Sequence, residues 1–218
     1  MITPRLRPKL PKLVGIHGHA GAGKDTLKEL ICVDRPNFFF YSFADPLKEA
    51  AAVAFGIPLS AFYNPETKEL PNHYWGITPR VIAQFLGTEM FRECIPKLMP
   101  GIGDSFWVER MEMRLSNCYV PEDEGLIIPT DTVVIPDVRF QNEYDWIIAN
   151  EGIIIHLTRP GFDGTIGIPG HSSESKLNLH TPERTYEIAN DGLISDLEQK
   201  LKDLNLFFPP IISLTSLF

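Results

Sequence analysis

Cysteine is scarce in this sequence, and the few cysteines are not paired. The 218 residues include three, Cys32, Cys94 and Cys118, and no C-x-x-C spacing occurs. Structural zinc sites and disulfide frameworks both need cysteines at short, regular spacing. The sequence therefore argues against both, and reduced thiols in a cytosolic protein are the simplest interpretation.

Long apolar runs and an excess of positive charge are also missing. No apolar run reaches the length of a membrane span, and the apolar tail at 205–218 is broken by proline. The net charge is −8 and the isoelectric point is near 5.2, which argues against extended contact with a nucleic-acid backbone. We therefore expect no membrane association and no stable nucleic-acid binding. The tail is expected to pack on the domain or on a second copy, which makes a homodimer one expectation.

The order of local patterns predicts one α/β domain at 12–204, preceded by a flexible basic arm at 1–11. Short runs rich in β-branched and aromatic residues predict strands, which are expected at 12–17, 38–43, 131–140, 152–159 and 186–191. Capped amphipathic runs predict helices, which are expected at 24–31, 46–56, 78–99, 104–117, 141–150 and 193–204. Strands that alternate with helices favour a parallel sheet wrapped by helices.

The segment GHAGAGKDT, at 18–26, is similar to a phosphate-binding loop. It follows a predicted strand and precedes a predicted helix, which is the context that such a loop requires. Glycines let successive backbone N–H groups converge on phosphate oxygens, and the helix adds its positive N-terminal end. The residues predicted to bind ATP here are Gly21, Ala22, Gly23, Lys24, Asp25 and Thr26. Lys24 is expected to reach the β- and γ-phosphates, and the alternative is an ordinary glycine-rich turn.

Asp25 departs from the usual motif, in which serine or threonine follows the lysine. The usual hydroxyl binds Mg²⁺, and a carboxylate can hold this ion directly or through water. Asp25 also falls in the first turn of a predicted helix, where the helix dipole favours negative charge without any metal. Both interpretations stay open, and either leaves Thr26 to contact phosphate.

A second predicted part of the site follows the apolar strand that ends in VVIPDVRF, at 133–140. Asp137 stands at the carboxyl end of this strand, which is where parallel sheets bind ligands. We predict that Asp137 holds Mg²⁺ through water, and the alternative is a cap for the helix at Gln141. Arg139 is predicted to neutralise charge on a transferring phosphoryl group, and the alternative is a surface charge. Lys24, Asp137 and Arg139 form the predicted catalytic group.

Further segments, taken together, resemble one family. They are SFADPLKE (42–49), TPRVIAQFLGTEMFR (78–92), DVRFQNE (137–143), RPG (159–161), HSSE (171–174) and YEIANDG (186–192). With the phosphate loop, and in this order, they resemble the deoxynucleoside monophosphate kinases encoded by bacteriophages, within the P-loop nucleoside monophosphate kinase group. The K-D-T form of the loop also occurs in that family.

The resemblance implies a fold, an activity and a division of the chain. The fold is a three-layer P-loop NTPase-type α/β fold, with a helical substrate-binding part at about 58–118 and a lid at about 159–177. The activity is transfer of the γ-phosphoryl group of ATP, with Mg²⁺, to a deoxynucleoside 5′-monophosphate. A bacteriophage origin would place the enzyme in the cytoplasm of a host cell.

The resemblance also carries over residues that bind the acceptor. By position, Arg80 and Gln84 would hold its phosphate and base, and their i, i+4 spacing puts both on one helix face. Arg92 is a further candidate on the same helix. The alternative for Arg80 is a surface charge near the start of a helix.

The segments near the end of the domain carry the remaining candidates. Arg159, His171 and Glu174 are expected to contact the substrate or to stabilise a closed lid, whose glycines would let it exclude water. The alternative for them is a solvated loop. Asn190 is expected to border the adenine through backbone contacts, so that its side chain matters little.

Two other functions are compatible with the same loop. A dephospho-coenzyme A kinase shares the phosphate loop and the lid, and a non-kinase ATP-binding module would bind nucleotide without an acceptor. The sequence leaves open which bases a monophosphate kinase would accept, because the pocket is shaped by tertiary structure.

Overall fold

A computed structural model describes residues 10, 12–117, 124–161 and 177–206 of the chain. Its centre is a sheet of five parallel strands in the order β2-β3-β1-β4-β5. The strands are β1 (Lys12–His17), β2 (Phe38–Phe40), β3 (Thr132–Ile135), β4 (Ile153–Thr158) and β5 (Thr185–Ala189). The predicted parallel α/β fold is therefore confirmed.

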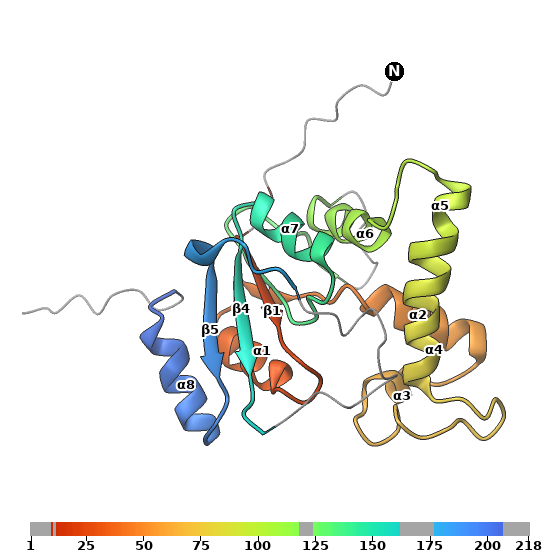
Figure 1. The fold of residues 1–218 in the computed structure, drawn as a ribbon, viewed down its shortest axis with the longest axis horizontal. Helices are drawn as coiled ribbons and strands as arrows, with labels where there is room; N and C mark the ends of the chain where they lie inside the picture. Colours follow the sequence, from red (N-terminus) through yellow and green to blue (C-terminus); the bar gives the residue numbers. More distant parts are fainter. Residues whose placement is uncertain (1–9, 11, 118–123, 162–176, 207–218) are drawn as a thin grey trace, which may run out of the picture.

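Helices cover both faces of this sheet (Figure 1). They are α1 (Lys24–Cys32), α2 (Asp45–Phe55), α3 (Ser60–Tyr63), α4 (Pro79–Phe85), the π-helix η1 (Leu86–Cys94), α5 (Ile95–Leu98), α6 (Phe106–Leu115), α7 (Gln141–Ala149), the 3₁₀ helix η3 (Pro182–Arg184) and α8 (Ile194–Asp203). Each described helix is too short or too polar to span a lipid bilayer.

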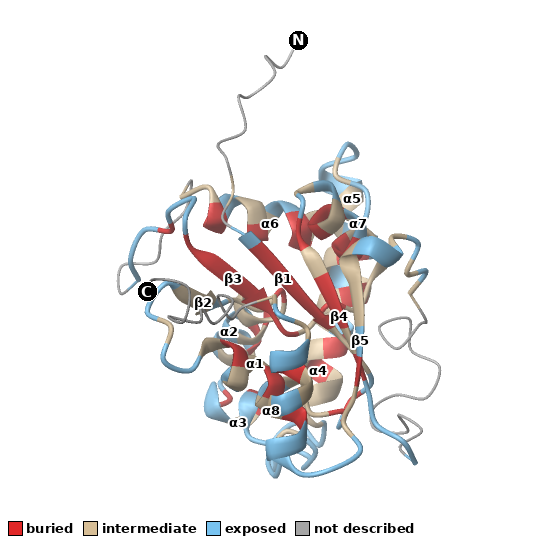
Figure 2. Ribbon diagram, turned by 90° about the vertical axis from the view of Figure 1, so that its left-hand side faces the viewer, coloured by how far each residue is buried: buried red, intermediate tan, exposed pale blue. Residues whose placement is uncertain are grey.

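The period of two along the strands sorts the core into two layers. In β1, Val14 and Ile16 face α1 and α8, where they pack on Leu27 and Leu197. Leu13 faces the opposite side, which is covered by α6 and α7. Figure 2 shows the central strands almost entirely buried between these layers. Parallel strands that are buried on both faces need nearly continuous apolar runs, as this sequence has.

The inserted helical part lies beside the sheet and has a small core of its own. Its core consists of Ala51, Ile57, Phe62 and Ile82, from α2 to α4. The helix expected at 78–99 begins as predicted, because Thr78 Oγ1 accepts the N–H of Val81 at 3.2 Å. Its central part is the π-helix η1, which the sequence did not predict. Such widened turns are frequent at functional sites.

Two strands are shorter than predicted. β2 ends at Phe40 rather than at 43, and β3 ends at Ile135, just before Pro136, which has no N–H to donate. The residues that follow each strand form loops at the carboxyl edge of the sheet instead. These two loops form part of the candidate site.

One buried ion pair joins the inserted part to the sheet. Arg92 of η1 donates from its Nη2 to Glu143 Oε1 of α7 at 2.5 Å, and the two residues are only 7% and 2% exposed. The guanidinium also lies over the ring of Phe140 and donates to the carbonyl oxygen of Asp104. Burial raises the pKa of Glu143, while the charge of Arg92 lowers it. Removal of either residue would therefore leave the other as a buried polar group without its charged partner.

Removing one member should destabilise the fold strongly. We expect Arg92→Met to lower the free energy of unfolding by about 3–5 kcal/mol, because it leaves a buried carboxylate without its cation. The double variant Arg92→Met/Glu143→Gln should recover part of this loss. Urea unfolding of the four proteins in a double-mutant cycle measures the coupling.

The matched control is Lys202→Met, which breaks the exposed pair with Glu198 on α8. It should cost no more than about 0.5 kcal/mol. A similarly small effect of Arg92→Met would contradict the structural role given to the buried pair.

Candidate active site

The phosphate loop connects β1 to α1 and leaves the start of that helix open. Gly23, with φ of 100°, directly precedes α1, and no side chain caps the helix. The N–H groups of the first turn therefore lack side-chain acceptors and point, with the positive end of the helix dipole, toward the loop. This arrangement fits a bound phosphate group.

Segments after β4 and β5 hold the loop in place. A Cβ atom on Gly18 would overlap the carbonyl oxygen of Leu157, and one on Gly23 would lie 2.5 Å from Asn190 Nδ2. Asn190 Nδ2 donates to the carbonyl oxygen of Ala22 at 2.8 Å, and Arg159 donates to that of Gly21 at 3.1 Å. The expectation that the Asn190 side chain matters little is therefore wrong, because its amide fixes the loop.

Lys24 lies over the loop that it follows. Its Nζ donates to the carbonyl oxygens of Gly18 and His19 at 2.6 and 2.8 Å. The ammonium therefore sits at the mouth of the loop. A lysine is a compact point charge on a flexible stem, so it can exchange loop carbonyls for phosphate oxygens.

Asp25 is almost fully in solvent. Its side chain is 88% exposed, and its nearest ion-pair partner is Lys28, 3.7 Å away on the next turn of α1. This placement suits a negative charge in the first helical turn. The carboxylate is also open to a metal ion, and Mg²⁺ usually takes only one or two protein carboxylates besides phosphates and water. The geometry is therefore compatible with both interpretations, and Thr26 is partly buried beside it.

Asp137 has a role that the sequence did not predict. Its carboxylate accepts hydrogen bonds from Ser42 Oγ at 2.5 Å and from the N–H groups of Phe43 and Ala44 at 3.0 Å. It thereby ties the loop after β2 to the turn after β3. It does not cap α7, and the N–H groups of Arg139 and Phe140 just before that helix donate to Glu143. Both oxygens of Asp137 thus accept hydrogen bonds from the loop after β2, and a role in holding Mg²⁺ through water stays a prediction.

The turn that carries Arg139 is fixed from several directions. The N–H of Val138 donates to Ile16 at 3.2 Å, and the His17 ring binds the Val138 carbonyl oxygen at 3.0 Å through Nδ1. Glu143 Oε2 accepts the N–H groups of Arg139 and Phe140 at 2.8 and 3.1 Å. The backbone of Arg139 is thus held at the carboxyl edge of the sheet, near the end of β1.

Arg80 and Gln84 lie on the inner side of α4, as their spacing predicts. Glu69 holds the Arg80 guanidinium through two bonds, 2.6 Å from Nε and 2.5 Å from Nη2. Gln84 is 9% exposed, and neither of its amide atoms has a hydrogen-bond partner among the described residues. A buried amide without partners costs free energy, so this side chain is available to a polar ligand.

Arg92, the third candidate on this helix, has protein partners instead. Its guanidinium is enclosed by Glu143, Asp104, Asn142 and Phe140. We therefore assign it a structural role in place of the substrate contact expected from the sequence. His171 and Glu174, the arm and most of the predicted lid and tail lie outside the described residues.

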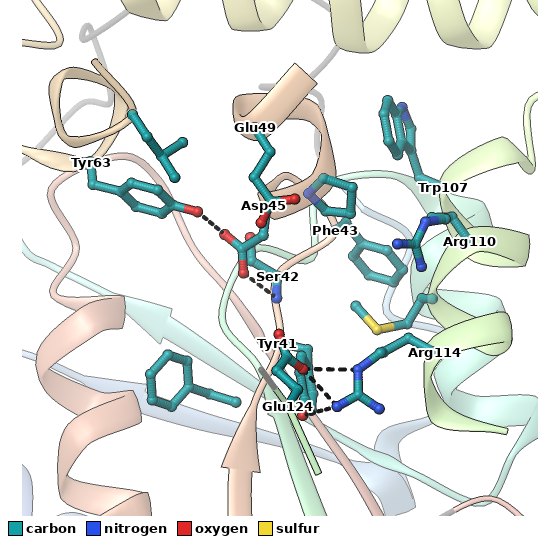
Figure 3. Close-up of a pocket in the computed structure, with 14 residues that line it drawn as sticks. Tyr41, Ser42, Phe43, Asp45, Glu49, Tyr63, Trp107, Arg110, Arg114 and Glu124 are labelled. Carbon is teal, nitrogen blue, oxygen red and sulfur yellow. Dashed lines mark hydrogen bonds and ion pairs between the residues drawn. The ribbon is translucent and has the colours of Figure 1, made fainter. Parts of the chain in front are cut away.

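The loop after β2 and the start of α2 contribute groups that motif reasoning did not assign. Asp45 accepts the Ser42 N–H at 3.1 Å and the Tyr63 hydroxyl at 2.8 Å (Figure 3). The ammonium of Lys48 lies 3.6 Å from the same carboxylate. Burial raises the pKa of Asp45, and the charge of Lys48 lowers it. Asp45 also lines a cavity of about 480 Å³ between α2 and α6. The signal was present in SFADPLKE, although no role in the site was assigned to its individual residues.

Other walls of this cavity are aromatic, aliphatic or charged. They include Tyr41, Phe43, Trp107, Arg110, Met111 and Arg114. Arg114 donates to Glu124 Oε2 and to the Tyr41 hydroxyl, which closes one end of the cavity (Figure 3). Burial raises the pKa of Tyr41 to about 12, so this hydroxyl stays protonated near neutral pH.

A comparison with known proteins identifies the family. No family model matches the chain. A protein of Acanthamoeba polyphaga mimivirus, provisionally named a deoxynucleotide monophosphate kinase, is 36% identical over 151 residues. The match covers 68% of this chain and 75% of that protein. The chain belongs to the deoxynucleotide monophosphate kinase family. The resemblance found in the sequence motifs is thereby confirmed at the level of the family.

Solved structures are more distant from this member of the deoxynucleotide monophosphate kinase family. A gluconokinase from Sinorhizobium meliloti has a TM-score of 0.39 at 13% identity, and the match covers 91% of this chain and 98% of that one. A Thermus thermophilus protein reaches 0.46 at 17% identity, with 90% and 97% covered. The family relative comes from a giant virus, so a bacteriophage origin stays a prediction.

The His17 ring gives this kinase-family protein a measurable dependence on pH. Burial lowers the pKa of His17 to about 4 from 6.5, and the charges of His156 and Lys24 act in the same direction. Between pH 6.5 and 4 the unfolded chain binds a proton that the folded protein does not, so stability falls as the pH falls. The loss from this group is at most about 3 kcal/mol.

The variant His17→Asn keeps a donor for Val138 but does not titrate. We expect its free energy of unfolding to fall less than that of the wild type between pH 6.5 and 4, as measured by urea unfolding at half-unit steps. His73→Asn, at an exposed position in the loop before α4, is the control and should follow the wild type. Parallel curves for wild type and His17→Asn would show that His17 is not responsible.

Proposed function

We propose that this protein transfers the γ-phosphoryl group of ATP to a deoxynucleoside 5′-monophosphate, giving the diphosphate. The observation that carries the proposal is the inner face of α4, which presents Arg80 and then the buried, unpartnered amide of Gln84. A cation followed by an amide one turn later suits a ligand with a phosphate at one end and a base at the other. Membership of the deoxynucleotide monophosphate kinase family supports the same acceptor.

The loop residues fit the donor nucleotide. The backbone N–H groups from Gly21 to Thr26 and the ammonium of Lys24 would hold its phosphates, and Asn190 and Arg159 keep the loop in shape. When bound, ATP supplies the phosphoryl group and Mg²⁺ neutralises charge on the phosphates. Asp25 is the carboxylate open to that ion, and Asp137 would act only through water.

The protein contributes position and charge to this reaction. Phosphoryl transfer needs little acid–base chemistry from side chains, and the main requirement is that donor and acceptor phosphates meet in line while their charge is neutralised. The fixed turn after β3 holds Arg139 near the phosphate loop, where its cation would stabilise the transferring group. Arg80, on the inserted part, would bind the acceptor phosphate.

A screen of acceptors tests the proposal. ADP production in a coupled assay is measured with each common deoxynucleoside and ribonucleoside monophosphate, and with dephospho-coenzyme A. We expect at least one deoxynucleoside monophosphate to raise the rate well above that with ATP alone. Lys24→Ala should lower kcat by about 10²-fold or more while the melting temperature changes little.

Two results would contradict this function. The first is that no monophosphate raises the rate above that with ATP alone. The second is phosphorylation of dephospho-coenzyme A with every deoxynucleoside monophosphate inert, which would favour the alternative kinase. Nucleotide binding without any acceptor would indicate a non-kinase module.

The role of Asp25 can be tested separately with Asp25→Ser, which restores the common form of the loop. If the carboxylate attracts Mg²⁺, the variant should need a higher Mg²⁺ concentration for its half-maximal rate, because a neutral ligand replaces a charged one. Asp203→Ser, at the exposed end of α8, is the control for a general change in surface charge. An unchanged Mg²⁺ dependence would leave Asp25 as a helix-end charge only.

A further inference from the structure

The loop between α3 and α4 places a lysine next to the proposed acceptor site. The Lys68 carbonyl oxygen accepts the N–H of Arg80 at 3.1 Å, and the Lys68 N–H donates to Asn64 at 3.0 Å. The neighbouring residue, Glu69, grips the Arg80 guanidinium. Lys68 and Arg80 are therefore fixed side by side, although they come from different parts of the insertion.

Charges from three other elements act on the Lys68 ammonium. The residue is half-buried, and burial is the main reason that its pKa is lowered. The cations of Arg80 on α4 and Lys48 on α2 lower this pKa further, while the carboxylates of Glu69 and Asp25 raise it. The charges that act on Lys68 therefore come from α1, α2 and α4 as well as from its own loop.

Lys68 differs from its two cationic neighbours in its partners. Arg80 is paired with Glu69, and Lys48 is paired with Asp45. Within the described part of the chain, Lys68 forms no such ion pair, and Asp25 on the facing helix is bound to Lys28 at 3.7 Å. Glu69 and Asp25 already offset part of the repulsion between these cations, and an anion that pairs with Lys68 would offset more of it. A phosphate monoester, which carries a charge between −1.5 and −2 at neutral pH, supplies that anion.

We propose that Lys68 binds the phosphate of the acceptor nucleotide, beside Arg80. This inference rests on the proposed function and adds a substrate-binding residue to it. The flexible stem of lysine suits the position, because the ammonium can stay with the acceptor phosphate as that phosphate becomes the inner one of a diphosphate. The Arg80 guanidinium, which Glu69 holds in place, would orient the phosphate. The Lys68 ammonium would follow the phosphate as its charge changes.

The test compares Lys68→Met with Lys68→Arg in the full chain. Binding of each deoxynucleoside monophosphate is measured by calorimetry without ATP, and the KM for ATP and the melting temperature are measured alongside. We expect Lys68→Met to bind the accepted monophosphate about tenfold or more weakly, with the KM for ATP and the melting temperature unchanged, and Lys68→Arg to recover much of the affinity. Lys97→Met, at an exposed lysine of α5 in the same insertion, should bind like the wild type.

The outcomes separate this inference from the proposed function. A wild-type protein that neither binds nor phosphorylates any monophosphate overturns the proposed function, and the role of Lys68 with it. A wild type that is active, together with Lys68→Met of unchanged affinity, overturns only the role of Lys68. If Lys68→Met raises the KM for ATP by the same factor as it weakens monophosphate binding, the residue has a structural role, and the inference is overturned. A clearly lower melting temperature of the variant would overturn it for the same reason.

One further comparison distinguishes a direct contact from an indirect one. If Lys68 acts only by attracting Asp25, then Asp25→Asn should reproduce the loss of affinity, and the double variant should lose no more than either single one. Direct binding of phosphate predicts instead that Lys68→Met weakens monophosphate binding by the same factor in the Asp25→Asn background as in the wild type.

Discussion

The buried carboxylate of Glu143 is the constraint on which the rest of the site depends. One of its oxygens takes the guanidinium of Arg92, and the other takes the N–H groups of Arg139 and Phe140. A single side chain thus connects η1 of the inserted part, the beginning of α7 and the turn after β3. Any movement of η1 relative to the sheet would break a charged contact in a buried place, which is costly. The inserted part therefore has one defined position, and Arg80 and Gln84 take theirs from it.

The residues of the site divide into those that hold the frame and those that remain available to ligands. Asp137, Asn190 and His17 each use their polar atoms to join loops that follow different strands. Gln84, Lys68 and Asp25 have polar atoms that face open or incompletely satisfied surroundings. A rigid frame with prepared charges suits phosphoryl transfer, in which position and electrostatics supply most of the rate.

Much of the fold could be predicted because its signals are local. The apolar strands, the glycine loop before α1, the Thr78 cap and the alternation of strands with helices all depend on residues close together in the chain. The placement of Asp137 and Arg139 at the ligand edge also followed, since the carboxyl ends of parallel strands meet there. The ends of β2 and β3 were less well predicted, and the π-helix η1 was not predicted at all. Those features depend on how loops bond to distant segments.

By itself, then, the sequence determined the parallel α/β sheet, the phosphate loop with Lys24, and the helix face that carries Arg80 and Gln84. Only the tertiary structure decided what the polar groups bind. Asp137 holds a loop 95 residues earlier in the chain, and Arg92 pairs with a carboxylate 51 residues later. Lys68 became a candidate for phosphate binding only because charges of α2, α4 and α1 act on it in the folded chain. The physical reason is that helix and strand preferences act over a few residues, whereas burial and charge depend on every segment that packs nearby.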